Sequence, residues 1–211
     1  IDCRADLVSD RYGFEAFNRG RIPGAKFVDL NRDLSGEPGL RGRHPLPDRN
    51  NWLETVRNLG IRNNDQIVAY DDMGGMYAAR FWWMMRWLGH ENVALLDGGI
   101  QQWESKLESG ENPARPIKSY YSSSKMLTKL IEINELTELL LQNESLRVVN
   151  LVDARTPERF AGLNEPIDKT AGHIPGAICL PFQENLDPDL SFKKAEKLRA
   201  RFEEIYGDGI M

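Results

Sequence analysis

The fold is decided by the stretch "QIVAYDDMGGMYAARFWWMMRWLG", which runs from Gln66 to Gly89. A short apolar run, Ile67 to Tyr70, predicts a buried strand, and the apolar run from Ala78 to Leu88 predicts a buried helix. The loop between them contains two glycines, an arrangement by which α/β proteins hold an anion or a nucleophile at a helix N-terminus. Yet the loop offers only Asp71 and Asp72, and carboxylates repel anions. The stretch therefore predicts an anion cradle, a loop shaped to bind an anion, whose own two carboxylates would repel an anion.

The pattern of short strands and helices continues on both sides of this stretch. Further strands are expected at 1–3, 26–29, 93–96 and 148–152, and further helices at 13–19, 51–59, 100–104, 133–141 and 194–206. This alternation indicates an α/β fold with a central parallel sheet flanked by helices on both faces. The run "FWWMMRWL" is expected to pack in the core, with a substrate-facing Trp82 or Trp83 as the alternative.

The composition excludes several classes of partner. The 211 residues are 41% hydrophobic and 28% charged, as in ordinary globular proteins. No apolar run approaches the roughly 20 residues of a membrane-spanning helix. The net charge of −5, without a basic block, argues against nucleic acid. We therefore expect a cytoplasmic protein with no membrane or nucleic-acid partner, and the sequence leaves its oligomeric state open.

The two cysteines, Cys3 and Cys179, lie in the apolar contexts "IDCR" and "GAICLPF". We interpret both as buried strand residues that pack as small hydrophobes. A disulfide is not expected in a cytoplasmic chain. The three histidines show no metal-ligand spacing with either cysteine, so neither a metal nor another cofactor is expected.

Two motifs occur twice in the same order. "DCR" at 2–4 recurs as "DAR" at 153–155, and "GRIPGA" at 20–25 recurs as "GHIPGA" at 172–177. The spacing of about 150 residues is the size of a domain, which indicates a duplicated domain. Residues 108–126 between the copies are rich in Ser, Pro and Gly. We therefore expect a first domain at 1–110, a linker at 111–125 and a second domain at 126–211.

The ordered motifs resemble the tandem rhodanese family of sulfurtransferases over nearly the whole chain. They are "DCR", "GRIPGA", "GRHPLP", the stretch from Gln66 to Trp103, "DARTPERF", "EPID" and "AGHIPGA". The resemblance implies two rhodanese-like domains, of which the second carries a catalytic cysteine on a loop and the first keeps the loop without it. It also implies that a thiolate takes the outer sulfur of thiosulfate as a persulfide and passes it to a thiophilic acceptor, cyanide or a thiol.

In that family the active loop reads roughly Cys-x-x-Gly-x-Thr-Ala. Laid on the first copy, the pattern puts its glycine on Gly75 and its cysteine on Asp72, which implies a non-catalytic first domain. The same loop of the second copy is expected beyond Met211, so we expect an incomplete second domain and an inactive chain. Cys179 is not expected to be the nucleophile, because a buried apolar thiol has a raised pKa.

The resemblance also implies a donor-binding residue. Arg159, six residues after Asp153 in "DARTPERF", matches the family's anion-binding arginine, and a guanidinium can pair bidentately with a sulfonate or carboxylate. Asp153 and Glu165 are expected to support this site, and Arg155 to serve structure. The alternative is a surface Arg159 paired with Glu158 or Glu165.

The sequence favours thiosulfate as the donor. Relatives that act on 3-mercaptopyruvate tend to carry a second arginine after "E-P", where this chain has Ile167 and Asp168. Asp168 would repel a carboxylate. The alternatives are a 3-mercaptopyruvate sulfurtransferase and a non-catalytic rhodanese-like binding or regulatory module. Nucleotide binding is not favoured, because the loop lacks both Gly-x-Gly-x-x-Gly and Gly-Lys-Ser/Thr.

Overall fold

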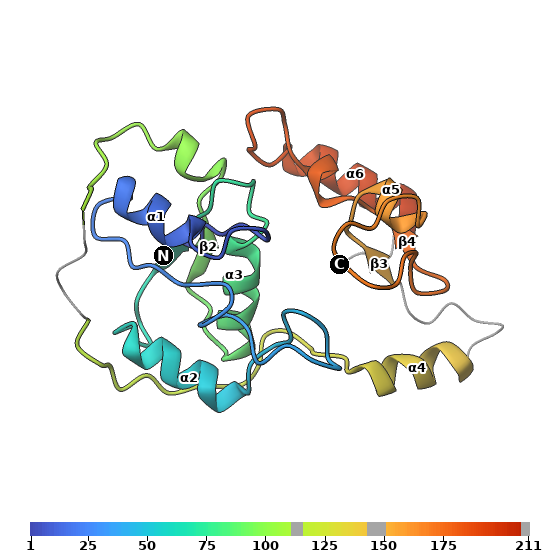
Figure 1. Ribbon diagram of the computed structural model, residues 1–211, viewed down its shortest axis with the longest axis horizontal. Coiled ribbons are helices and arrows are strands. Elements are labelled where there is room, and N and C mark those ends of the chain that lie inside the picture. The colour runs from blue at the N-terminus through green and yellow to red at the C-terminus, as the bar shows by residue number, and fades with distance from the viewer. Residues whose placement is uncertain (111–115, 143–150, 208–211) are drawn as a thin grey trace. The chain divides into compact units, whose positions relative to one another are not determined.

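The computed structural model describes residues 1–110, 116–142 and 151–207 (Figure 1). The chain forms two compact units, Ile1–Lys129 and Leu130–Met211. Each holds a small parallel sheet flanked by helices, which confirms the expected α/β class. The domain limits at 110 and 126 stay predictions, and residues 111–115 of the expected linker lie outside the described residues.

The sheet of the first unit is built around one short parallel pair. Strand β1 (Ile67–Ala69) pairs with β2 (Val93–Leu95). Asp2 adds single parallel bridges to Phe27 and Tyr70, so the strands expected at 1–3 and 26–29 are reduced to bridges. Directly after Cys3, the Arg4 side chain bonds back to Asp2 at 3.0 Å.

Three helices of the first unit match the expected ones within two residues. They are α1 (Tyr12–Arg19), α2 (Arg49–Asn58) and α3 (Ala78–Trp87). Helix α3 packs on β1 and β2, and its Phe81 and Met84 side chains are buried. The Trp52 indole of α2 donates to the Met84 carbonyl at 2.9 Å and meets the Phe81 ring edge to face. The apolar run of α3 is thus packed in the core of this unit.

The two half-buried tryptophans of α3 are held by contacts within the same unit. The Trp82 indole N–H donates to the Val93 carbonyl at 3.1 Å, and the Arg86 guanidinium lies over the Trp82 ring. The Trp83 ring stacks on Trp87, with centroids 5.9 Å apart. These contacts support packing as the role of both rings.

The helix expected at 100–104 is instead one turn of 3-10 helix, η1 (Gly99–Gln102). Gly98 and Gly99 have φ angles of 72° and 65°, in the left-handed region. Trp103 is already extended, with a ψ angle of 105°. Left-handed residues on one side and an extended residue on the other leave no room for an α-helical hydrogen-bond ladder.

The second unit contains one parallel pair, β3 (Val152–Asp153) with β4 (Ile178–Cys179). Its other elements are α4 (Ile133–Gln142), α5 (Pro157–Phe160), the 3-10 helix η2 (Phe182–Asn185) and α6 (Ala195–Tyr206). The helices expected at 133–141 and 194–206 are present. Of the strand expected at 148–152, residues 148–150 lie outside the described residues. None of the helices in the described ranges is both long and apolar enough to cross a bilayer.

The cysteines differ in burial. Cys3 is 1% exposed, as expected, whereas Cys179 on β4 is only half-buried. The expectation of a fully buried Cys179 is therefore wrong, because β4 pairs along two residues with β3 and is incompletely covered. Burial nevertheless raises the pKa of both thiols.

Close packing at Gly13 gives a test of this fold. A Cβ atom at this position of α1 would lie 2.0 Å from the Arg4 carbonyl oxygen and 3.1 Å from Phe27 Cε2. We expect Gly13→Ala to lower the free energy of unfolding by about 2–4 kcal/mol, even though alanine favours helix by about 1 kcal/mol. Urea unfolding followed by tryptophan fluorescence measures it, because all five tryptophans lie in the first unit.

Gly39→Ala is the matched control. A Cβ atom at Gly39 would meet nothing within 4 Å, so its stability should stay within about 0.5 kcal/mol of the unmodified chain. Equal stability of the two variants would contradict the packing of α1 on Arg4.

Candidate functional site

The repeated Asp-x-Arg motif forms a fork in the second unit. Arg155 Nε donates to both carboxylate oxygens of Asp153, at 2.9 and 3.0 Å, and Arg155 Nη2 donates to Asp153 Oδ2 at 2.5 Å. The same Nη2 donates to the Gly172 carbonyl at 2.6 Å. The hydrogen bonds from Arg155 lower the pKa of Asp153. The fork therefore ties the end of β3 to the start of "GHIPGA".

The first unit repeats this fork atom for atom. Arg4 Nε donates to the two Asp2 oxygens at 3.0 and 3.1 Å, and Nη2 donates to Asp2 Oδ2 at 2.6 Å. Arg4 Nη2 also reaches the Gly20 carbonyl at 2.7 Å. Both motifs found by sequence repetition thus meet in the same way in each unit.

A second contact also recurs between the units. The His173 ring stacks on Phe160 with centroids 3.7 Å apart, and His173 Nδ1 lies 2.8 Å from the Phe160 carbonyl oxygen. In the first unit the Arg21 guanidinium lies over the Phe17 ring, and its Nη1 donates to the Phe17 carbonyl at 3.4 Å. Phe160 and Phe17 therefore occupy equivalent positions.

This equivalence locates the residue that differs between the copies. Arg159 directly precedes Phe160, and the residue directly before Phe17 is Ala16, which is buried. The first unit thus buries a methyl group where the second presents a guanidinium. Only the second unit offers a cation at this position.

Arg159 lies in the last turn of α5, and the structure places it against two carboxylates. Its Nε and Nη2 donate to Glu165 at 2.8 to 3.1 Å, and Nη2 also donates to Asp168 Oδ2 at 2.9 Å. Its side chain is 19% exposed. Of the two partners that the surface alternative named, the structure brings Glu165 to Arg159, and it adds Asp168, which the sequence did not suggest as a partner.

Glu165 is the centre of this arrangement, and its side chain is only 4% exposed. It accepts from Arg159, from Arg155 Nη1 at 3.2 Å, and from the backbone N–H groups of Ile167 and Asp168 at 3.1 Å. Burial acts to raise the pKa of Glu165, but the backbone donors and Arg159 outweigh it, and the pKa is lowered. An ionised Glu165 therefore bridges two arginines.

We call Asp153, Arg155, Arg159, Glu165 and Asp168 the Arg159 cluster. Its members contribute two positive and three negative charges, so Arg159 is already paired. The Asp168 side chain is 46% exposed, which makes it the partner that a ligand could displace most readily. An anion that replaced Asp168 would meet a guanidinium whose orientation Glu165 fixes. No group of three or more His, Cys, Asp or Glu residues suited to a metal ion occurs in the described part of the chain.

In the loop after β1, the first of the two carboxylates accepts hydrogen bonds from the backbone of the loop itself. Asp71 is 1% exposed, and its Oδ1 accepts from the backbone N–H groups of Met73 and Gly75, both at 2.9 Å. Its Oδ2 accepts from the N–H groups of Tyr77 and Ala78 at 2.8 and 2.9 Å. The anion cradle at the N-terminus of α3 is thus filled by a side chain of the loop itself. The sequence signal was an acid three residues before the glycine pair and seven before the helix start at Ala78.

Asp72, which the resemblance places at the cysteine position, faces α1. The Tyr12 hydroxyl donates to Asp72 Oδ2, and the Gln101 side-chain amide donates to the Asp72 carbonyl at 2.8 Å. Asp72 Oδ1 is buried without a hydrogen-bond partner among the described residues. Burial raises the pKa of Asp72. The two adjacent aspartates therefore have different surroundings: four backbone donors satisfy Asp71, whereas the Asp72 carboxylate accepts from a single hydroxyl and keeps one oxygen unpaired among the described residues.

Comparisons with known proteins place this geometry among relatives. The family model for the rhodanese-like domain matches residues 1–106 and 133–206. The chain is 41% identical over 208 residues to a probable 3-mercaptopyruvate sulfurtransferase of Pseudomonas aeruginosa, covering 96% of this chain and 71% of that one. It is 39% identical over 184 residues to the putative thiosulfate sulfurtransferase SseB of Mycobacterium tuberculosis, covering 85% and 63%.

Solved structures agree with these sequence relatives. The crystal structure of SseA from Escherichia coli, described as a 3-mercaptopyruvate sulfotransferase, matches with a TM-score of 0.78 at 27% identity. The match covers 100% of this chain and 77% of that one. The chain thus spans less than two thirds of the Mycobacterium tuberculosis relative, and about three quarters of the Escherichia coli structure.

The filled cradle can be tested by removing one charge. Asp71→Asn replaces an acceptor oxygen by an amide that faces backbone N–H donors. We expect it to lower the free energy of unfolding by about 2–4 kcal/mol, measured by urea unfolding with tryptophan fluorescence. Asp72→Asn is the matched control and should change stability by less than about 1 kcal/mol, because burial already disfavours the Asp72 carboxylate. A variant at Asp71 as stable as the one at Asp72 would refute the capping role.

Proposed function

Because the chain belongs to the rhodanese family of sulfurtransferases, whose domain model matches both of its halves, we propose that it forms part of a thiosulfate sulfurtransferase. The reaction moves a sulfane sulfur from thiosulfate to a thiophilic acceptor, cyanide or a thiol. In this proposal the second unit supplies the donor-binding arginine, and the first unit serves as a non-catalytic partner.

The observation that carries the proposal is the guanidinium of Arg159, oriented by the buried Glu165 and covered by the exposed Asp168. Thiosulfate carries three oxygens on its inner sulfur, and two of them match the fork of an arginine. Displacement of Asp168 by the donor leaves the Arg159–Glu165 pair in place. The donor would then sit in a site whose cation needs no reorientation.

The chemistry is a pair of sulfur transfers. A cysteine thiolate attacks the outer sulfur of thiosulfate, the S–S bond of the donor breaks, and sulfite leaves with the electron pair. The acceptor then attacks the terminal sulfur of the persulfide, which regenerates the thiolate and, with cyanide, forms thiocyanate. Arg159 holds the donor oxygens and stabilises the charge that grows on the departing sulfite.

Neither cysteine of the 211 residues suits the role of nucleophile. Cys3 is buried, and desolvation raises its pKa. Cys179 is half-buried on β4, with its pKa raised by burial and by the nearby Asp153. Thiolate chemistry needs the opposite shift. We therefore propose that the sulfur-carrying cysteine is not among these 211 residues.

The first unit is proposed to be non-catalytic for two reasons. Asp72 stands at the position that the family's pattern gives to cysteine, and a carboxylate cannot carry a sulfane sulfur. The backbone N–H groups that would hold a persulfide are bonded to Asp71.

Two alternatives remain specific enough to test. The first is 3-mercaptopyruvate as the donor, which the names of the Pseudomonas aeruginosa and Escherichia coli relatives suggest. Its carboxylate would need a cation near Arg159, where the chain has Ile167 and Asp168 instead. The second is a non-catalytic binding or regulatory module, in which the Arg159 cluster is held closed by its own carboxylates.

Replacing Arg159 tests the proposal. In the complete gene product, Arg159→Ala should lower kcat/KM for thiosulfate by about 10- to 100-fold, mainly through KM, because it removes a charged hydrogen-bond pair worth about 1.5–3 kcal/mol. Thiocyanate formation from thiosulfate and cyanide measures it. Arg199→Ala, on the exposed side of α6, is the control and should retain full activity.

Three outcomes would overturn parts of the proposal. Full activity of Arg159→Ala removes the assigned role of that residue. Absence of turnover in the unmodified gene product favours the binding module. Thiocyanate formation by the 211-residue chain alone would show that Cys3 or Cys179 is the nucleophile after all.

Asp168 gives a separate test of donor choice. We expect Asp168→Asn to raise kcat/KM for 3-mercaptopyruvate relative to thiosulfate by about 3- to 10-fold, because the carboxylate of 3-mercaptopyruvate would lie beside residue 168, whereas thiosulfate needs only the fork of Arg159. Both donors are assayed in parallel on the complete gene product. Glu196→Gln, an exposed change on α6, should leave the ratio unaltered. An unaltered ratio in Asp168→Asn would exclude Asp168 from donor selection.

A further inference from the structure

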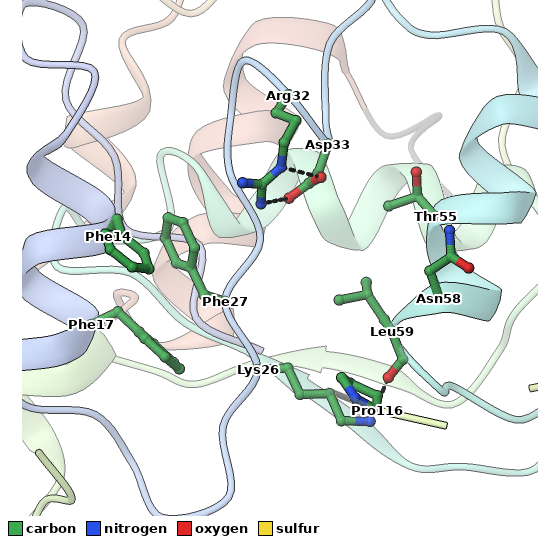
Figure 2. A pocket seen from close by; sticks show the side chains of 10 residues that line it. All are labelled: Phe14, Phe17, Lys26, Phe27, Arg32, Asp33, Thr55, Asn58, Leu59 and Pro116. Carbon is green, nitrogen blue, oxygen red and sulfur yellow. Dashed lines mark hydrogen bonds and ion pairs between the residues drawn. The ribbon is translucent and has the colours of Figure 1, made fainter. Parts of the chain in front are cut away.

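The first unit contains a cavity of about 530 Å³ that the Arg159 cluster does not explain. Figure 2 shows Phe14, Phe17 and Phe27 on one side of it, with Thr55 and Asn58 of α2 opposite. The volume lies in the range of small-molecule sites in proteins, which are largely apolar with a few polar groups. The cavity therefore has the size and the lining of a ligand site.

The aromatic side of the cavity is partly fixed and partly open. The Phe27 ring lies 6.0 Å from Phe14 and 5.6 Å from Phe17, at interplanar angles of 58° and 40°. Phe17 is buried, whereas Phe14 is 50% exposed. An exposed ring beside two anchored ones offers a surface on which another aromatic ring can pack edge to face or offset.

The ammonium group of Lys26 lies at one end of the cavity. Lys26 Nζ donates to the Leu59 carbonyl oxygen at 2.5 Å, and its side chain is half-buried. An ammonium has three N–H donors, and this contact uses one of them. The partner is a neutral carbonyl, so the charge of Lys26 is not compensated by it.

At the other end of the cavity, the charged side chains are paired with each other. Figure 2 shows Arg32 and Asp33 across the cavity from Lys26. Arg32 Nε and Nη2 donate to Asp33 at 2.9 and 2.6 Å, and the Asp29 backbone N–H adds a third donor to the same carboxylate at 2.8 Å. The Arg32 charge is thus matched by Asp33, and the net positive charge of the described lining residues lies at Lys26.

We propose that this cavity binds a small monocarboxylate that bears an aromatic ring, with the ring against Phe14 and Phe27 and the carboxylate on Lys26. Among the described residues that line the cavity, Lys26 is the cation without an ion-pair partner, so it fits one negative charge and opposes an amine. The aromatic wall favours a ring over a short aliphatic acid. The inference goes beyond sulfur transfer and does not depend on it, because every residue that it uses lies in the first unit and outside the Arg159 cluster.

The test uses the 211-residue chain and 3-phenylpropionate as the probe, with calorimetric titration as the readout. We expect saturable one-site binding with a dissociation constant on the order of 1 mM, typical of a ligand of this size. Propionate, which lacks the ring, and 3-phenylpropylamine, which reverses the charge, should each bind at least about 10-fold more weakly. Equal binding of either compound, or no saturable binding of 3-phenylpropionate, overturns the proposal.

Variants then assign the two contacts. Lys26→Met should weaken 3-phenylpropionate about 10-fold and abolish the preference over the amine, and Phe14→Leu should weaken it about 3- to 10-fold. Lys106→Met, at an exposed lysine, is the control and should bind as the unmodified chain does. Unaltered binding in both cavity variants sinks the proposal. Should Lys26→Met fail to fold, the exposed Phe14 and the amine comparison still decide it.

Discussion

Both units depend on one interaction, the fork between an aspartate at a strand end and the arginine two residues later. In the first unit this pair is almost fully enclosed, with side-chain exposures of 0% for Asp2 and 8% for Arg4. A buried ion pair adds little net stability compared with apolar packing of the same volume. Removing one partner is nevertheless costly, because it leaves an uncompensated charge in the interior. The Tyr70 hydroxyl also donates to Asp2, at 2.9 Å. The fork therefore constrains the strand end, the neighbouring strand and the Ile-Pro-Gly-Ala turn together.

On this shared frame the two copies have diverged in opposite directions. The first copy buries small or self-satisfied groups, Ala16 in α1 and Asp71 in the loop after β1. The second copy has the four-residue α5 in place of the eight-residue α1, and it places Arg159 beside Glu165 and Asp168. The difference is local, because the forks and the aromatic contacts of Phe17 and Phe160 stay equivalent.

The α/β class, the duplication and the long helices could be predicted from the sequence, because each is indicated by periodic apolar residues or by repeated sequence motifs. The pairing of Arg159 with Asp168 was missed, since it depends on how the Glu165 turn folds back onto α5. The partners of Asp71 were missed for a similar reason: four backbone N–H groups converge on it only once the loop adopts its left-handed glycines. The partial exposure of Cys179 depends on how far β3 and β4 pair, and the sequence pattern did not predict that this pairing spans only two residues. The roles of Arg159, Asp153, Glu165 and Asp72 stay predictions.

The carboxylate of Asp71 also bears on how easily a sulfur-carrying cysteine could arise in the first copy. Placing a cysteine at position 72 alone would put a thiol next to a cradle whose donors are already taken by residue 71. Removing Asp71 alone would leave four buried donors without an acceptor and weaken the unit before any new activity appeared. Only the two changes together would free the backbone donors and supply a thiol beside them. If the first copy is non-catalytic as proposed, the self-capped loop therefore ties residues 71 and 72 together, because a useful change at one requires a change at the other.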